Sequence, residues 1–404
     1  MRLLSTVLAL CTVFPMVANA QPATEAAPAA TPAPEAAPAP APAPAPAAEA
    51  AAPAAPAAPA APAPIAFGWE ALVDAYYMYN FTGDPKTQGP VGRQFDTMSN
   101  SFSLNYAKLG VHADTDLVTF RMDVGAGHTA AIINAANTGL AAPAATGTAP
   151  APDTTATFGN SFLVQQAYAE VKPHPNVSID AGRFVTSASA EVIESNKNWL
   201  YSRSFLFYGV PLVHTGLRVN AALLGTIAAP ELVLSLQLVN GWNNDPDNNS
   251  DKTFGLNLTY TPLNQGLTAS LTSYIGKEAV GGNTQILVDG VVTKDIGNVS
   301  VGGNVDYYKL DSAHWFGISA MGRFIASDAF TLAARVEYLK CKGAYLPVDG
   351  ALYEFTGMGA WTVGKHYELR AEIRADMSDQ EVFFKGTEAK KNQVTGLLAA
   401  LAYF

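Results

Sequence analysis

The sequence predicts an all-β fold, a transmembrane antiparallel β-barrel of about sixteen strands, with fourteen as the second choice. Three observations support this. Apolar side chains recur at every second position in many segments, which is the period of a strand with one apolar face. These segments last about ten to thirteen residues, enough for a tilted strand to cross a bilayer, whereas soluble strands average about five or six. Charged residues make up only 14 % of the chain, which is low for a soluble protein.

Residues 1–20 have the features of a cleavable signal peptide. Arg2 gives a positive start, and the apolar stretch from Leu3 to Val17 is too short to span a bilayer securely. Ala18-Asn19-Ala20 places small residues at the −3 and −1 positions, so we expect cleavage before Gln21. Lipidation at Cys11 is the less favoured alternative, because a lipoprotein signal needs a small residue directly before the cysteine. The sequence therefore predicts export from the cytoplasm.

Residues 21–64 form a linker made almost wholly of Ala and Pro. Its only charges are Glu25, Glu35 and Glu49. Repeated Pro blocks helix propagation, and Ala offers little surface to bury. We therefore expect an extended, disordered tether with polyproline II character, and a barrel that occupies residues 65–404.

The alternation within residues 65–404 separates an apolar face from a polar face. From Trp69 to Phe81 the odd positions are mainly aromatic or aliphatic, whereas Glu70, Asp74 and Asn80 share the other face. No apolar run has the length and purity of a transmembrane helix, because Pro230 interrupts the nearest candidate. Aromatic residues near strand ends suit the two membrane interfaces: Trp69, Tyr79, Phe81, Trp242, Tyr260 and Phe404.

The alternating segments and the turn signals between them define the expected strands. Segment 283–292 has the weakest pattern, and the register of 101–113 shifts near Ala107. Long connections at 82–100, 129–161 and 186–212 alternate with tight turns, as in barrels with short periplasmic turns and longer outer loops. The predicted strands are 69–81, 101–113, 117–128, 162–172, 177–185, 213–224, 231–243, 252–261, 267–277, 283–292, 298–310, 314–325, 330–341, 351–362, 366–377 and 393–404.

Charged side chains on the polar faces would be severely penalised in a dry core but not beside water. We therefore expect the following residues on the wall to line a wet interior: Arg121, Asp123, Arg335, Glu337, Arg370, Glu372 and Arg374. Opposite charges on neighbouring strands would also hold the strand register. The alternative is that these charges form structural ladders that plug the interior.

Several motifs resemble those of the OmpL-like putative β-barrel porin family. They are AEVIE at 190–194, NWLYSRS at 198–204 and PLVHTGLR at 211–218, supported by QQAY at 165–168, DAGRF at 180–184 and RVEY at 335–338. The resemblance covers roughly residues 67–404 and leaves out the Ala/Pro linker. It implies an outer-membrane barrel in bacteria that allows passive diffusion of small hydrophilic solutes. Tyr403 and Phe404 also resemble the C-terminal aromatic signal that the barrel-assembly machinery reads.

The third long loop, 186–212, is the candidate constriction, because in general porins the third outer loop folds into the barrel and narrows it. Its charged residues Glu191, Glu194, Lys197 and Arg203 could set a transverse field that selects ions. Three more candidates flank the loop on the wall and could line the pore: Arg183, His214 and Arg218. The alternative is a structural salt bridge between Arg203 and Glu191 that pins the loop.

Other classes of function have little support in the sequence. A net charge of −10 argues against nucleic-acid binding. Common catalytic and nucleotide-binding motifs are absent, so we expect no enzyme and no cofactor. The oxygen-rich segment 243–251 lacks EF-hand spacing, and an ordinary polar loop is favoured over a metal site. Outer-membrane lipid is an expected partner, and a homo-oligomer is plausible by porin analogy alone. The competing function is a plugged structural or partner-binding barrel without transport.

Overall fold

The computed structural model describes residues 65–83, 89–137, 161–279, 281–346 and 349–404. The predicted signal peptide and the Ala/Pro linker lie outside these residues, as does most of the long connection 129–161.

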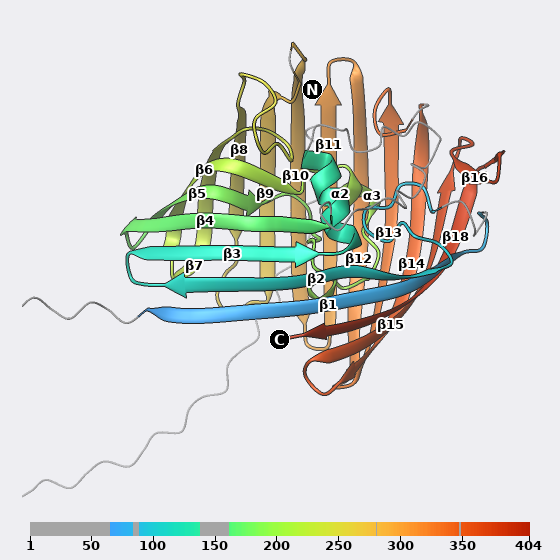
Figure 1. Cartoon of the computed structure of the whole chain (residues 1–404), viewed down its shortest axis with the longest axis horizontal. Coiled ribbons are helices and arrows are strands. Elements are labelled where there is room, and N and C mark those ends of the chain that lie inside the picture. The colour runs from blue at the N-terminus through green and yellow to red at the C-terminus, as the bar shows by residue number, and fades with distance from the viewer. Residues whose placement is uncertain (1–64, 84–88, 138–160, 280, 347–348) are drawn as a thin grey trace, which may run out of the picture. The chain divides into compact units, whose positions relative to one another are not determined.

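Sixteen strands form one closed antiparallel barrel (Figure 1). Each strand pairs with its sequence neighbours, and β1 pairs with β18 to close the ring. The predicted fold and its first-choice strand number are confirmed. The strands are β1 (Ala66–Asn80), β2 (Ser101–Asp114), β3 (Val118–Ala126), β4 (Phe162–His174), β5 (Val177–Val185), β6 (Val213–Thr226), β7 (Ala229–Val239), β8 (Thr253–Tyr260), β9 (Leu267–Lys277), β10 (Thr284–Ile296), β11 (Val299–Leu310), β12 (Ala313–Ser327), β13 (Phe330–Lys342), β14 (Gly350–Val363), β15 (Tyr367–Ser378) and β18 (Asn392–Tyr403).

The largest differences from the predicted strand ends are four residues, in β10 and β7, and both have local reasons. Strand β10 continues beyond 292 to Ile296, because its last residues pair with the start of β11. Strand β7 ends at Val239 rather than at 243, since Gly241 adopts a positive φ of 143°. Trp242 consequently lies in a loop, where its ring packs on Tyr308 with centroids 5.8 Å apart. The prediction that Trp242 belongs to a lipid-facing girdle is therefore wrong.

The outer face of the barrel carries the apolar half of the alternation. Trp69 is 63 % exposed, Val336 47 %, Phe355 50 % and Ile373 61 %. Near the start of β2 the pairing with β1 shifts between Asp74 and Ala75, which leaves Asn105 as an extra residue. This bulge lies two residues before the predicted position and turns Lys108 inward, where it is 5 % exposed.

The connections differ between the two ends of the barrel. One end has short turns, such as Gly297-Asn298 between β10 and β11, where Gly297 has a φ of +59°. The other end carries most of the long loops, helix α2 (His128–Asn137), helix α3 (Phe205–Tyr208), the 3₁₀ turn η1 (Ser195–Lys197) and the small hairpin of β16 (Phe383–Lys385) and β17 (Glu388–Lys390). No helix among the described residues has the length and apolar character needed to cross a membrane.

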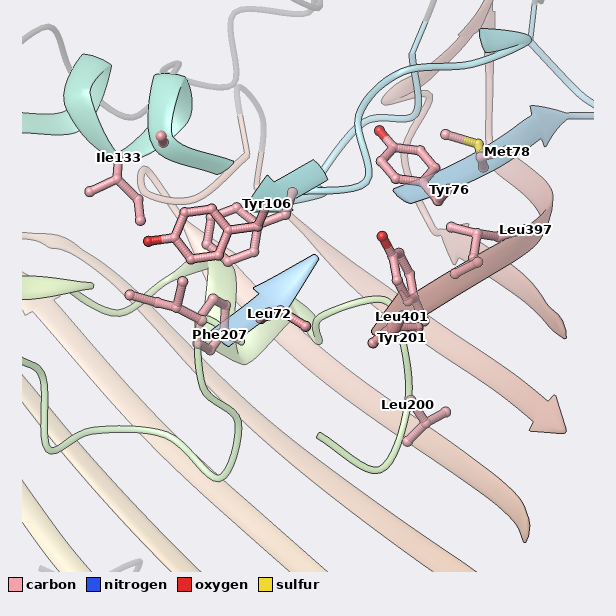
Figure 2. Packing of buried hydrophobic residues seen from close by; sticks show 14 of the residues in the cluster. Leu72, Tyr76, Met78, Tyr106, Ile133, Leu200, Tyr201, Phe207, Leu397 and Leu401 are labelled. Carbon is pink, nitrogen blue, oxygen red and sulfur yellow. The ribbon is translucent and has the colours of Figure 1, made fainter. Parts of the chain in front are cut away.

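The interior of the barrel contains packed apolar side chains. Figure 2 shows Tyr201 of the third loop beside Tyr76 of β1 and Leu401 of β18, with Ile133 of α2 in the same cluster. Tyr76 and Tyr201 have ring centroids 5.8 Å apart. Several loops of the long-loop end therefore converge inside the ring, and the expectation of a wholly water-filled interior is wrong for the region that they fill.

Candidate functional site: the third loop inside the barrel

The third loop, residues 186–212, folds into the barrel and is held there through its backbone. Glu372 of β15 accepts hydrogen bonds from the amide of Tyr201 at 2.7 Å and from the amide of Ser202 at 3.2 Å. Glu337 of β13 accepts from the amides of Phe205 and Leu206, both at 2.7 Å. These carboxylates satisfy amides that would otherwise be buried without partners, which makes them anchors for the loop.

Wall arginines bind the carbonyl oxygens of the same loop. Arg335 donates to Ser202 O at 2.9 Å, and Arg370 donates to Ser195 O at 2.9 Å. Arg374 donates to Arg203 O at 2.5 Å. These three arginines are at most 5 % exposed, and Glu337 and Glu372 at most 6 %. All five face inward as predicted, but the prediction that they line open water is wrong, because the loop covers them.

The four predicted constriction residues have different environments. Glu191 pairs with Arg335 at 2.7 Å and accepts from the amide of Ser204 at 2.8 Å. Arg203 is 2 % exposed and donates to carbonyl oxygens of its own loop, including Val192 O at 3.0 Å. Arg203 thus cannot contribute to a water-facing constriction, and no Arg203–Glu191 salt bridge occurs in the described part of the chain. The loop is pinned, but by other contacts.

Glu194 belongs to a buried cluster around Lys108. The Lys108 ammonium lies 2.9 Å from Glu70 Oε1 and 3.0 Å from Asp123 Oδ2, and it also pairs with Glu194. Oxygens of these three carboxylates lie within 4.8 Å of one another. Such a group could hold a metal ion, but Lys108 supplies the compensating positive charge.

The pKa of Glu194 lies below its ordinary value. Burial is the largest single influence and raises this pKa, but the charges of Lys108 and Lys197, with hydrogen bonds from Lys108 and Gln165, outweigh burial. Lys197 is the one predicted constriction residue that stays about half exposed to water. Its side chain is 45 % exposed, and its ammonium lies 3.2 Å from Glu70 Oε2.

The remaining predicted lining residues fall into two groups. Arg121 lies 2.6 Å from Glu70, and Arg218 lies 2.6 Å from Asp180. Their side chains are 25 % and 19 % exposed, so both retain contact with water as predicted.

Asp123, Arg183 and His214 do not meet the expectation of a water-facing wall. Asp123 is 0 % exposed within the Lys108 cluster. Arg183 reaches Asp245 in the loop between β7 and β8, at 3.1 Å. His214 is 0 % exposed and stacks on Tyr274, with centroids 4.5 Å apart.

Three important interior residues were not predicted as site residues. Asp74 of β1 accepts hydrogen bonds from Ser195 and Tyr201 of the third loop, at 2.5 and 2.8 Å. Its inward position was evident from the alternation, but its contact with a loop 121 residues away has no sequence signal. Glu354 of β14 pairs with Arg335 at 2.9 Å across neighbouring strands. The alternation could not decide whether Lys108 points into or out of the barrel, because the strand register shifts close by.

The interior has a wet part and a packed part, and the packed part includes the long-loop half and the inner face of β18. In the short-turn half, inward charged side chains remain accessible: Glu70 at 33 %, Arg323 at 32 % and Asp295 at 59 %. In the long-loop half, described inward side chains from around the ring are shielded from water. Examples that are at most 2 % exposed are Met78, Asp123, His214, Tyr274, Asp306, Trp315, Leu339 and Asp376.

The wet polar space on the short-turn side of the third loop is called the vestibule below. A closed barrel with an apolar outer face, such a polar vestibule and an inward-folded loop defines a porin-like outer-membrane protein. The chain belongs to the family described as "Putative beta-barrel porin-2, OmpL-like", whose model matches residues 66–404. The predicted family is thus confirmed. No curated protein sequence matches the chain.

Several solved structures share the fold at low sequence identity. The anion-selective porin from Comamonas acidovorans is 12 % identical with a TM-score of 0.55, covering 84 % of this chain and 100 % of that one. Pseudomonas putida OprB is 11 % identical with a TM-score of 0.55, covering 84 % and 94 %. The trimer form of Vibrio cholerae OmpT is 12 % identical with a TM-score of 0.52, covering 84 % and 99 %. At such identities the likeness shows the fold alone.

Proposed function

We propose that this outer-membrane barrel is a passive diffusion channel for small hydrophilic solutes or ions, narrowed by its third loop. The observation that carries the proposal is the polar vestibule, which ends at the loop where Lys197 and Glu70 meet in water. Opposite charges that face a water-accessible passage can select ions by their field. Because Arg203 and Glu194 are buried, Lys197 is the residue of this loop through which selectivity should act.

Conductance of the refolded full chain in a planar bilayer tests the proposal. Stepwise openings are expected, with small amplitude because the loop fills much of the interior. Lys197→Ala should shift the permeability ratio toward cations, since a positive charge leaves the accessible passage. Lys340→Ala is a matched control, because Lys340 pairs with Asp379 near the outer loops and is 54 % exposed. An unchanged ratio in Lys197→Ala would contradict the role of the loop.

A second candidate function, a plugged structural or partner-binding barrel, is favoured by the packing of the long-loop half. Inward side chains around the ring in that half are shielded from water, among them His214, Tyr274 and Leu339, so transport would require a passage that the loops now fill. A persistently silent bilayer with confirmed insertion would support this function and exclude the channel.

The path to the membrane is also part of the proposal. Residues 1–20 would direct export and be removed, and residues 21–64 would remain as a tether. Tyr403 and Phe404 would present the terminal signal to the barrel-assembly machinery. Phe404 is 63 % exposed and stacks on His366 of the turn between β14 and β15, at the short-turn end, with centroids 4.8 Å apart. A homo-oligomer is proposed because one structural neighbour is described as a trimer.

A further inference from the structure

A pocket of about 210 Å³ lies between the third loop and the wall, facing the wet half of the barrel. The loop contributes Lys197, Trp199 and Leu200, strand β10 contributes Thr293 and Asp295, and strand β12 contributes Met321 and Arg323. The volume is below the ~300–1,000 Å³ typical of drug-sized ligand sites. The pocket therefore suits a small solute.

Arg323 is the most distinctive group in this pocket. Its guanidinium lies 5.2 Å from the centre of the Trp199 ring, in a cation–π arrangement. One nitrogen, Nη2, donates to Ser300 Oγ at 2.9 Å and lies 3.8 Å from Asp295 Oδ1. The Nε donor also lacks a partner among the described residues but is shielded from water. The side chain is nevertheless 32 % exposed, and its one hydrogen bond among these residues comes from Nη2, so Nη1 is left without a partner. A planar guanidinium with unused donors is suited to bind an oxyanion.

The other charges of the pocket leave this positive group available. Both oxygens of Glu191 are engaged, by Arg335 and by the amide of Ser204. Asp295 accepts from Ser300 at 2.6 Å and only partly neutralises Arg323 at its longer distance. Lys197 adds a second cation on the loop side, half in water.

Three larger apolar side chains also line the pocket, beside the polar Asn198 and Thr293. Trp199, Leu200 and Met321 form this part of its lining. Trp199 is seated over Gly302 of β11, where an added Cβ would lie 3.3 Å from the indole and 3.1 Å from Met321 Cγ. The indole can approach the wall closely because position 302 has no side chain. A solute that fits would thus have one anionic end and one compact apolar part.

We propose that this pocket is a binding subsite for small organic carboxylates, with Arg323 as the residue that binds the carboxylate and Trp199, Leu200 and Met321 around the apolar part. The inference deepens the proposed function, because it names a class of solute for the same vestibule. Entry is from the short-turn half, so binding does not require passage through the packed half.

Binding to the detergent-refolded full chain tests the subsite, with benzoate and its uncharged analogue benzamide as probes. Saturation-transfer NMR titrations should show saturable binding of benzoate and much weaker binding of benzamide. Arg323→Gln should weaken benzoate binding about tenfold, the loss expected for one charge-assisted hydrogen bond, and leave benzamide unchanged. Arg121→Gln is the matched control, since Arg121 is a part-exposed cation of the same interior outside the pocket.

Two results would overturn the subsite: equal binding of benzoate and benzamide, or equal weakening of benzoate by Arg323→Gln and Arg121→Gln. If Arg323→Gln does not fold, Arg323→Lys and the two probes on the unaltered chain decide the question. Conductance is recorded separately. A silent bilayer with saturable benzoate binding overturns the channel alone. Conduction with equal binding of benzoate and benzamide overturns the subsite alone.

Discussion

The anchoring of the third loop by Glu372 can be tested by removing that carboxylate. Glu372 is 6 % exposed and accepts from the two successive amides of Tyr201 and Ser202. Hydrogen bonds to a charged group contribute about 1.5–3 kcal/mol each, so Glu372→Ala should cost about 3–6 kcal/mol of loop docking. Glu372→Gln keeps one acceptor oxygen and should cost about half as much.

The assay combines conductance with thermal unfolding of the folded band in SDS. Glu372→Ala should raise the open-channel conductance or the opening frequency and lower the unfolding temperature, with Glu372→Gln in between. Glu388→Gln is a suitable control, because Glu388 lies on the outer hairpin with its side chain 67 % exposed. If Glu372→Ala matches the unaltered chain in both measurements, the loop is not held by this carboxylate and the anchoring argument fails.

Three further predictions concern the interior charges and the outer face. Because the pKa of Glu194 is lowered in the folded chain, ionised Glu194 should stabilise the fold fully above its ordinary pKa of 4.5, and this stabilisation should disappear as the pH falls through the lower folded value. The unfolding temperature measured against pH, for the unaltered chain and for Glu194→Gln, tests this. The prediction is contradicted if both chains lose stability in the same way at acid pH. Lys108→Met should leave the three carboxylates of Glu70, Asp123 and Glu194 with only Arg121 and Lys197 as neighbouring cations, so added Ca²⁺ should raise the unfolding temperature of this variant more than that of the unaltered chain. An equal response in both chains would refute this prediction. Val336→Arg on the lipid-facing side of β13 should destabilise the inserted barrel by up to about 2–4 kcal/mol if the position lies near the bilayer midplane. Urea unfolding in lipid vesicles measures the free energy of unfolding. No loss of stability would place Val336 away from the bilayer core.

The wall of the barrel could be predicted from the sequence because it depends on local periodicity. A two-residue period fixes which side chains share a face, and a closed ring turns those faces into an inside and an outside. Trp69 and Ile373 are exposed on the outside, and Arg335 and Glu372 face inward, as their positions in the alternation require. The strand ends could not be predicted as closely, since a single Gly241 with positive φ ends β7 early.

The contents of the barrel could not be predicted in the same way. Periodicity states that Glu372 points inward, but not whether it meets water or the amides of a loop about 170 residues away. The predicted constriction therefore mixed a water-facing residue, Lys197, with the buried Glu194 and Arg203. Each of these is a long polar side chain in the same loop, and only the three-dimensional path of the loop distinguishes them.

One sequence signal for the packed interior was nevertheless present in the last strand. In β18 the outward positions are apolar, as at Leu398, but so are the inward positions Leu397, Ala399 and Leu401. A strand between lipid and open water has no reason to be apolar on both faces, because the inner face would expose hydrocarbon to water. Apolar residues on both faces of a barrel strand therefore predict that something covers the inner face, and here the third loop supplies Leu200 and Tyr201 to the same cluster (Figure 2). The same test, applied strand by strand, separates the sector where a barrel is filled from the sector where solutes can pass.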